Sequence, residues 1–169
     1  CGRVTSTGMK TDGTCWVWGR NNNGALGLND ENARSSPTQL SGTNWKKVCL
    51  DTDGSLGTKT DGTLWGWGSN DSGVLGHNNN NNYSSPRQVG TDTTWHDVET
   101  GGYGEWVKAS KTDGTLWVWG NNTQGQLGLN NTTKYSSPVQ VPGFVDGRKD
   151  LVFGNLASTA YASAVLSEQ

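Results

Sequence analysis

Charge, cysteine and long apolar runs are all scarce in this chain, and each shortage excludes a class of protein. Only 17% of the 169 residues are charged and the formal net charge is -2. A disordered chain usually carries more charge, and a nucleic-acid-binding protein is usually basic. No apolar run approaches the roughly 20 residues that a membrane-spanning helix needs, and no signal-peptide pattern is present. The composition therefore predicts one globular domain with no nucleic-acid partner and no membrane partner.

The few cysteines and histidines form no catalytic or metal-binding pattern. Cys1, Cys15 and Cys49 lack the spacing of metal ligands and are odd in number, so they are either small buried residues or include one disulfide. His77 and His96 are expected to be structural or solvated. The sequence has neither a Gly-x-Ser-x-Gly nucleophile motif nor a glycine-rich phosphate loop. We therefore predict that the protein is not an enzyme and uses no metal and no cofactor.

Glycine and tryptophan, in contrast, are abundant, at 25 and 9 residues. This combination predicts tight turns around large buried anchors and argues against helices. The reason for it is an internal repeat of roughly 50 residues. Lys-Thr-Asp-Gly-Thr-x-Trp-x-Trp-Gly occurs at 10–19, 59–68 and 111–120, Gly-x-Leu-Gly at 24–27, 73–76 and 125–128, Ser-Ser-Pro at 35–37, 84–86 and 136–138, and Trp-x-x-Val at 45–48 and 95–98.

Each repeated piece predicts one element of an antiparallel sheet. Asp-Gly predicts a two-residue type I′ hairpin turn. Trp-x-Trp predicts a strand with both indoles on one face and the other apolar side chains on the opposite face, so that both faces are covered. The Leu of Gly-x-Leu-Gly is expected to pack beneath the sheet, Ser-Ser-Pro to open a short outer strand, and Trp-x-x-Val to open the next inner strand. The structural residues of the repeat are Trp16, Trp18, Trp65, Trp67, Trp117, Trp119, Asp12, Gly13, Asp61, Gly62, Asp113 and Gly114.

Four strands per repeat is the count of a β-propeller blade. The pattern Asp-Gly-Thr-Leu-Trp-x-Trp-Gly-x-Asn, followed by Gly-Gln-Leu-Gly and Ser-Ser-Pro, resembles the regulator-of-chromosome-condensation repeat family. The exact residues of these motifs resemble bacterial and phage members more than eukaryotic ones. The resemblance implies a seven-bladed β-propeller, which needs about 350 residues. The fold class expected here is therefore all-β, with about three four-stranded antiparallel blades plus a partial one, as an open arc or a fragment of a seven-bladed ring. The expected boundaries within this one propeller domain are 1–44 (partial first blade), 45–94, 95–146, and 147–169 (first strands of a further blade).

The function predicted from these features is recognition. Asn-rich loops at 20–23, 77–83 and 130–135 should lie on one face, because a repeat places equivalent loops equivalently. They are either loop filler or a polar contact surface. The candidate partner-binding residues are Asn79, Asn80, Tyr83, Trp106 and Tyr135, of which Trp106 either caps the central channel or contacts a partner.

We therefore predict a non-enzymatic propeller that binds a protein or glycan, as a phage tail or capsid appendage in a virion or extracellular location. The alternatives are an exchange factor for a small GTPase, which the resemblance implies, and a secreted protein-inhibitor propeller. Self-assembly that completes a ring is a further prediction.

Overall fold

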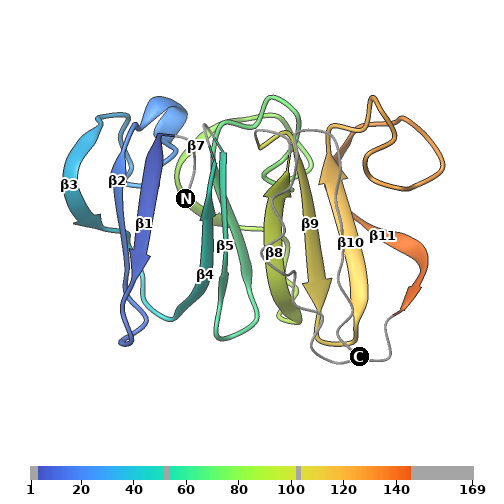
Figure 1. Cartoon of the computed structure of the whole chain (residues 1–169), viewed down its shortest axis with the longest axis horizontal. Coiled ribbons are helices and arrows are strands. Elements are labelled where there is room, and N and C mark those ends of the chain that lie inside the picture. The colour runs from blue at the N-terminus through green and yellow to red at the C-terminus, as the bar shows by residue number, and fades with distance from the viewer. Residues whose placement is uncertain (1–3, 52–53, 102–103, 146–169) are drawn as a thin grey trace.

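The computed structural model describes residues 4–51, 54–101 and 104–145 as three antiparallel sheets that lie side by side (Figure 1). Sheet 1 has the strand order β1-β2-β3, sheet 2 the order β4-β5-β6-β7, and sheet 3 the order β11-β10-β9-β8. The strands are β1 (Thr5–Met9), β2 (Cys15–Gly19), β3 (Arg34–Gln39), β4 (Trp45–Leu50), β5 (Gly54–Lys59), β6 (Leu64–Gly68), β7 (Tyr83–Gln88), β8 (Trp95–Gly101), β9 (Trp106–Lys111), β10 (Thr115–Gly120) and β11 (Tyr135–Val145). One short 3-10 helix, η1 (Asn22–Gly24), follows β2.

The repeated motifs begin the strands that the sequence predicts. Trp45 and Trp95 open β4 and β8, which form one edge of sheets 2 and 3. The Ser-Ser-Pro segments lie in β3, β7 and β11 at the opposite edge, where a proline costs no ladder hydrogen bond. Within the described residues, sheet 1 has no counterpart of β4 and β8. The predicted strands at 147–169 lie outside the described residues.

The predicted type I′ turn is wrong. In the first hairpin Gly13 N–H donates to the Lys10 carbonyl at 3.1 Å, and Lys10 N–H donates to the Thr14 carbonyl at 2.9 Å. A type I′ turn requires positive φ at both central residues. Gly13 has a φ of 79°, but Asp12 does not have a positive φ, because every described non-glycine residue with positive φ is an asparagine. The hairpin is a type I turn closed by a left-handed glycine. Asp12 instead uses its carboxylate to accept the Thr14 N–H at 2.9 Å.

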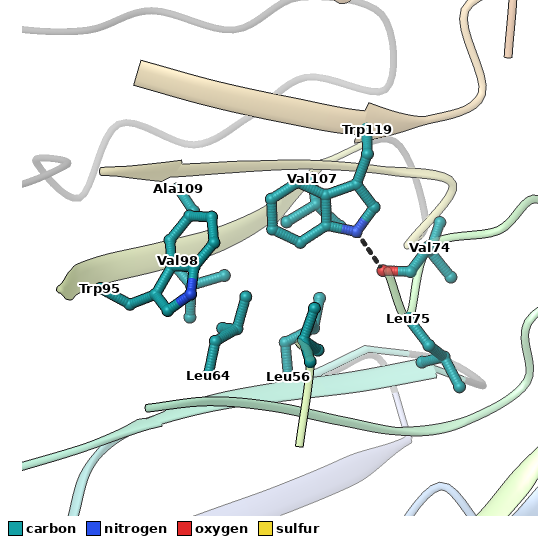
Figure 2. Close-up of a cluster of buried hydrophobic side chains, with 10 residues drawn as sticks. Leu56, Leu64, Val74, Leu75, Trp95, Val98, Val107, Ala109 and Trp119 are labelled. Carbon is teal, nitrogen blue, oxygen red and sulfur yellow. Dashed lines mark hydrogen bonds between the residues drawn. The ribbon is translucent and has the colours of Figure 1, made fainter. Parts of the chain in front are cut away.

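The sheets pack through apolar faces, and the later sheet of each pair contributes the tryptophans. Figure 2 shows the cluster between sheets 2 and 3, in which Trp119 is 0% exposed and its Nε1 donates to the Val74 carbonyl at 2.7 Å. Between sheets 1 and 2, Trp67 is also 0% exposed and donates to the Ala25 carbonyl at 3.0 Å. Leu64, on the same strand as Trp67, packs in the other cluster. The predicted division of apolar side chains between two faces is therefore confirmed.

The described cysteines are free thiols. Cys15 is buried in the cluster between sheets 1 and 2, with its Sγ 3.1 Å from the Thr7 hydroxyl. Cys49 donates from Sγ to the Val98 carbonyl at 3.3 Å, and burial raises the pKa of its thiol to about 11. Cys1 lies outside the described residues. Of the two alternatives, the structure supports small apolar residues without a disulfide, of which Cys15 is buried and Cys49 is partly buried.

Candidate partner-binding loops

The three Asn-rich loops follow β2, β6 and β10 and lie at the same edge of the array, at the top of Figure 1. The hairpin turns that join β1 to β2, β5 to β6 and β9 to β10 lie at the opposite edge. The repeat therefore produces the arrangement that the sequence predicts, with equivalent loops in equivalent places.

A buried asparagine organises each loop from inside. Asn70 is 0% exposed; its Oδ1 accepts the Leu75 N–H at 2.9 Å and its Nδ2 donates to the Asn79 carbonyl at 2.8 Å. Asn21 and Asn122 repeat the same contacts in the other two loops. One side chain thus satisfies two backbone groups that burial would otherwise leave unpaired. This residue is the Asn of the Trp-Gly-x-Asn motif, so its spacing in the sequence was the available signal, but only the structure assigns its role.

A second pair of residues, four positions apart, closes the outer part of each loop. In the second loop Asn79 Nδ2 donates to the Tyr83 hydroxyl at 3.2 Å, and in the third Asn131 Nδ2 donates to the Tyr135 hydroxyl at 3.2 Å. The first loop has an ion pair at the same positions, which Asp30 and Arg34 form at 2.6 Å. We call this pair the latch. Its hydrogen bonds hold the loop to the start of the outer strand.

Three of the candidate partner-binding residues are therefore also parts of the loop scaffold. Asn79, Tyr83 and Tyr135 are half-buried and hydrogen-bonded within their own loops, whereas Asn80 is exposed. The exposed tips at equivalent positions are Glu31 and Asn32, Asn80 and Asn81, and Thr132 and Thr133. The sequence alone gave no reason to separate the tips from the latch.

The expectation for Trp106 needs correction. Trp106 is 1% exposed and packs with Leu116, Val118 and Leu127 in a cluster of sheet 3, so it offers no surface to a partner. Gly101 makes room for it, because a Cβ there would collide with the indole. Neither of the other repeats has a tryptophan at this position, so the repeat pattern carried no signal that the side chain is buried.

The two histidines have structural surroundings. His77 lies edge-on to Tyr83 with ring centroids 5.1 Å apart, and its Nε2 is 3.4 Å from the Gly66 carbonyl oxygen. Burial lowers the pKa of His77. The guanidinium carbon of Arg87 lies 4.8 Å from the Tyr83 ring centre, a cation–π contact. His96 is half-buried, and its carbonyl accepts a hydrogen bond from Lys46 at 2.9 Å.

The opposite edge of the array is held by a chain of local contacts that recurs in every repeat. Asp61 Oδ1 accepts from the Thr63 hydroxyl at 2.6 Å, and that hydroxyl accepts from Trp65 Nε1 at 2.8 Å. Lys59 Nζ lies 4.0 Å from the Trp65 ring centre, a cation–π contact. The hydrogen bonds from threonine lower the pKa of the carboxylate in each repeat, at Asp12, Asp61 and Asp113. These contacts stabilise each hairpin turn.

Charged side chains also join the inner strands of sheets 2 and 3. Lys47 Nζ is 2.7 Å from Asp97 and 3.9 Å from Glu99, and Lys108 Nζ is 3.0 Å from Glu99. Lys108 is 3% exposed, so its charge is neutralised within the sheet. In the part of the chain that the structure describes, no group of three or more His, Cys, Asp or Glu residues is placed to hold a metal ion, and no helix has the length and apolar character of a membrane span.

The geometry of the repeat agrees with comparisons with known proteins. Residues 12–50, 61–104 and 113–152 match the regulator of chromosome condensation (RCC1) repeat. The chain belongs to the RCC1 repeat family. A human relative, X-linked retinitis pigmentosa GTPase regulator, is 30% identical over 145 residues, which are 83% of this chain and 14% of the relative.

Solved structures share the fold. Human WBSCR16 superposes with a TM-score of 0.73 at 26% identity, over 84% of this chain and 36% of that protein. Prp20p of Saccharomyces cerevisiae superposes with a TM-score of 0.72 at 18% identity, over 83% of this chain and 37% of that one. The prediction of β-propeller blades is confirmed. The chain spans little more than a third of those structures and about a seventh of the human relative. It therefore corresponds to part of a propeller.

Proposed function

We propose that this RCC1-repeat chain is a non-catalytic protein-binding module whose partner contacts the exposed tips of the three Asn-rich loops. The observation that carries the proposal is the repeated internal scaffold of these loops. A buried asparagine and a latch hold each loop, and the tips stand above them at equivalent positions along one edge. A surface that is ordered before binding loses little conformational entropy when a partner docks.

The known relatives support a protein as the partner class. The Prp20p structure was described together with its binding to Gsp1p and histones, and Kap60 has been solved bound to yeast RCC1 (Prp20). The relatives named here are human and yeast proteins, and none of their names refers to a virion or a glycan. A glycan ligand and a phage appendage therefore stay predictions without support from these comparisons.

Site-specific photo-crosslinking tests the proposal. A photo-crosslinking amino acid replaces Asn80 at a loop tip or, as the matched control, Thr60 at a hairpin turn of the opposite edge. Both positions are exposed, and both lie in connections between strands of sheet 2. In a lysate of the producing cells, position 80 should capture a discrete protein and position 60 should not. Equal capture at both positions, or at neither, would contradict binding at the loop edge.

Regulation of a small GTPase is the second candidate, because the human relative that is 30% identical is a GTPase regulator. Nucleotide release from a purified small GTPase, measured with and without this chain, tests it directly. Acceleration that is lost in an Asn80→Arg, Asn81→Arg double variant would support this candidate and place it at the loop edge. Release at the uncatalysed rate would remove it.

A further inference from the structure

The second repeat departs from the other two at three positions in the chain segments around Tyr83. Repeats 1 and 3 have aliphatic side chains or a threonine there, whereas repeat 2 has a glycine, a histidine and an arginine. The residues compared are Val17, Gly66 and Val118 within Trp-x-Trp, Leu28, His77 and Leu129 after Gly-x-Leu-Gly, and Thr38, Arg87 and Val139 after Ser-Ser-Pro. Departures of this kind are expected at functional sites, because they give up packing that the repeat otherwise provides.

Gly66 shows that the departure changes the packing. Val17 and Val118 are buried in apolar clusters, whereas Gly66 contributes no side chain to one. A Cβ on Gly66 would lie 2.8 Å from the Leu75 carbonyl oxygen, so the second loop lies too close to β6 for a valine. The carbonyl oxygen of Gly66 is 3.4 Å from His77 Nε2. Because a glycine inside a strand weakens it, repeat 2 gives up stability that the other two repeats keep.

His77, Tyr83 and Arg87 form a stack beside the outer strand of sheet 2, which we call the arginine stack. The His77 ring meets the Tyr83 ring edge-on, with the ring planes at 82°. Tyr83 also packs against the cluster between sheets 2 and 3, and its hydroxyl accepts from Asn79 Nδ2 at 3.2 Å. The guanidinium carbon of Arg87 lies over the same ring, 4.8 Å from its centre. Tyr83 is fixed by its neighbours, and it therefore orders the guanidinium group before a partner binds.

The charge of Arg87 is exposed, and no carboxylate of the residues that the structure describes forms an ion pair with it. The arginine of the first loop differs in both respects, because Arg34 is half-buried and lies 2.6 Å from the Asp30 carboxylate. A guanidinium group presents its N–H donors as a planar fork that matches the two oxygens of a carboxylate. The contact with the Tyr83 ring leaves this charge without a counter-ion, so it attracts an anionic group from outside the chain.

We propose that Arg87, positioned by Tyr83 and His77, binds a carboxylate in an acidic segment of the protein partner. Complementary charge favours such a segment, and arginine and tyrosine are among the residues that contribute most to protein interfaces. The arginine stack adjoins the loop tip, because the Tyr83 hydroxyl is bonded to Asn79, the neighbour of Asn80. The inference rests on the proposed function, since it assigns the chemistry of one contact to the partner of the loop tips.

Titration with a hexaglutamate peptide tests the site without the partner. Nuclear magnetic resonance follows the side-chain Nε–Hε signals of Arg87 and of Arg20, an exposed arginine in the first Asn-rich loop that serves as the internal control. At constant ionic strength, hexaglutamate up to about 10 mM should shift the Arg87 signal to saturation and leave the Arg20 signal in place. Arg87→Gln should weaken binding at least about tenfold, measured on the Tyr83 ring signals, and Arg20→Gln should leave it unchanged.

Three outcomes of the titration would overturn the inference. The first is an Arg87 signal that does not move. The second is an equal shift at Arg20 and Arg87, which would show general attraction between charges. The third is saturation by inorganic phosphate at a lower concentration than by hexaglutamate, which would show that the site prefers phosphate to carboxylate.

Photo-crosslinking separates failure of this inference from failure of the proposed function. In the chain that carries the crosslinking amino acid at position 80, Arg87→Gln should reduce capture of the partner at least about tenfold, and Arg20→Gln should not. Undiminished capture with Arg87→Gln would overturn the carboxylate contact and leave the proposed function intact. If position 80 captures no protein even with Arg87 present, the proposed function fails, and the hexaglutamate titration alone decides whether Arg87 binds carboxylates. Circular dichroism verifies that both variants remain folded.

Discussion

Replacement of Trp119 by phenylalanine isolates the contribution of the indole hydrogen bond between sheets. Trp119 is 0% exposed and donates to the Val74 carbonyl at 2.7 Å. Without the donor, a buried carbonyl loses its partner, which costs about 1–3 kcal/mol. The smaller ring also leaves part of the site empty, which adds about 1 kcal/mol. We expect Trp119→Phe to lower the free energy of unfolding by about 2–4 kcal/mol, or the Tm by about 5–15 °C.

Two matched variants separate the contact between sheets from effects within one sheet. Trp117 lies on the same strand and face but is partly exposed, and its Nε1 donates to the hydroxyl of Thr115 in its own hairpin at 2.9 Å. Trp117→Phe should cost about 0.5–1 kcal/mol. Trp18 has the same place in the repeat as Trp119 but has no preceding sheet among the described residues, so Trp18→Phe should cost less than about 1 kcal/mol.

Urea unfolding followed by far-UV circular dichroism, which does not depend on tryptophan fluorescence, measures all three variants. The chain must be dilute enough to be monomeric, so that any self-association does not contribute. If Trp18→Phe destabilises the chain as much as Trp119→Phe, the second tryptophan acts within its own sheet, and the reasoning about contacts between sheets is refuted.

Three further predictions concern the loops and turns. Asn70→Ala removes the partner of the Leu75 amide; it should cost about 2–4 kcal/mol and speed hydrogen exchange at Leu75, whereas Asn80→Ala at the exposed tip should change neither. Gly62→Ala adds a methyl group at a φ of 79° and against a backbone carbonyl, so thermal unfolding should reveal a loss of more than about 2 kcal/mol. Burial alone would raise the pKa of Asp92, but hydrogen bonds from Lys111 and Thr94 outweigh it and lower that pKa from 3.8 to about 2. Because the folded-state pKa is depressed, the stabilisation is present above about pH 4 and is lost as the pH falls towards 2. Asp92→Asn should therefore flatten the dependence of Tm on pH in this window, and an unchanged slope would contradict the assignment.

The sequence predicts the sheets well because each strand is specified by large apolar side chains at fixed spacing. The alternation in Trp-x-Trp separates two faces, and the structure places Trp67 and Leu64 in different clusters as that alternation requires. Trp-x-x-Val and Ser-Ser-Pro likewise open the inner and outer strands. Such patterns determine the fold because burial of the side chains decides which face of a strand turns inward.

The sequence predicts the hairpin turns and the loops less well, because hydrogen bonds to side chains determine their backbone conformation. Asp-Gly is compatible with a type I′ turn, which needs positive φ at both residues. In these turns the aspartate carboxylate instead accepts hydrogen bonds from the threonine two residues on, and of the two turn residues the glycine alone has a positive φ. In the Asn-rich loops, the composition does not distinguish a buried asparagine that bonds two backbone groups, such as Asn70, from an exposed one, such as Asn80. The burial of Trp106 is equally hard to predict, since a Cβ on residue 101 would collide with the indole and the space exists because this residue is a glycine.

The latch shows that the repeats of one chain can supply a signal that one repeat alone does not. At the same two positions, four residues apart, the chain has Asp30 with Arg34, Asn79 with Tyr83, and Asn131 with Tyr135. The first pair is an ion pair and the other two are neutral hydrogen bonds, so the chemistry changes at both positions together. A change at only one position would leave a half-buried polar group without its partner, which is unfavourable. Asp30→Asn should therefore destabilise the first loop, and the double change Asp30→Asn, Arg34→Tyr should restore it. Amide hydrogen exchange of the first loop measures both effects, and a double variant no more protected than Asp30→Asn would show that the two positions are not coupled.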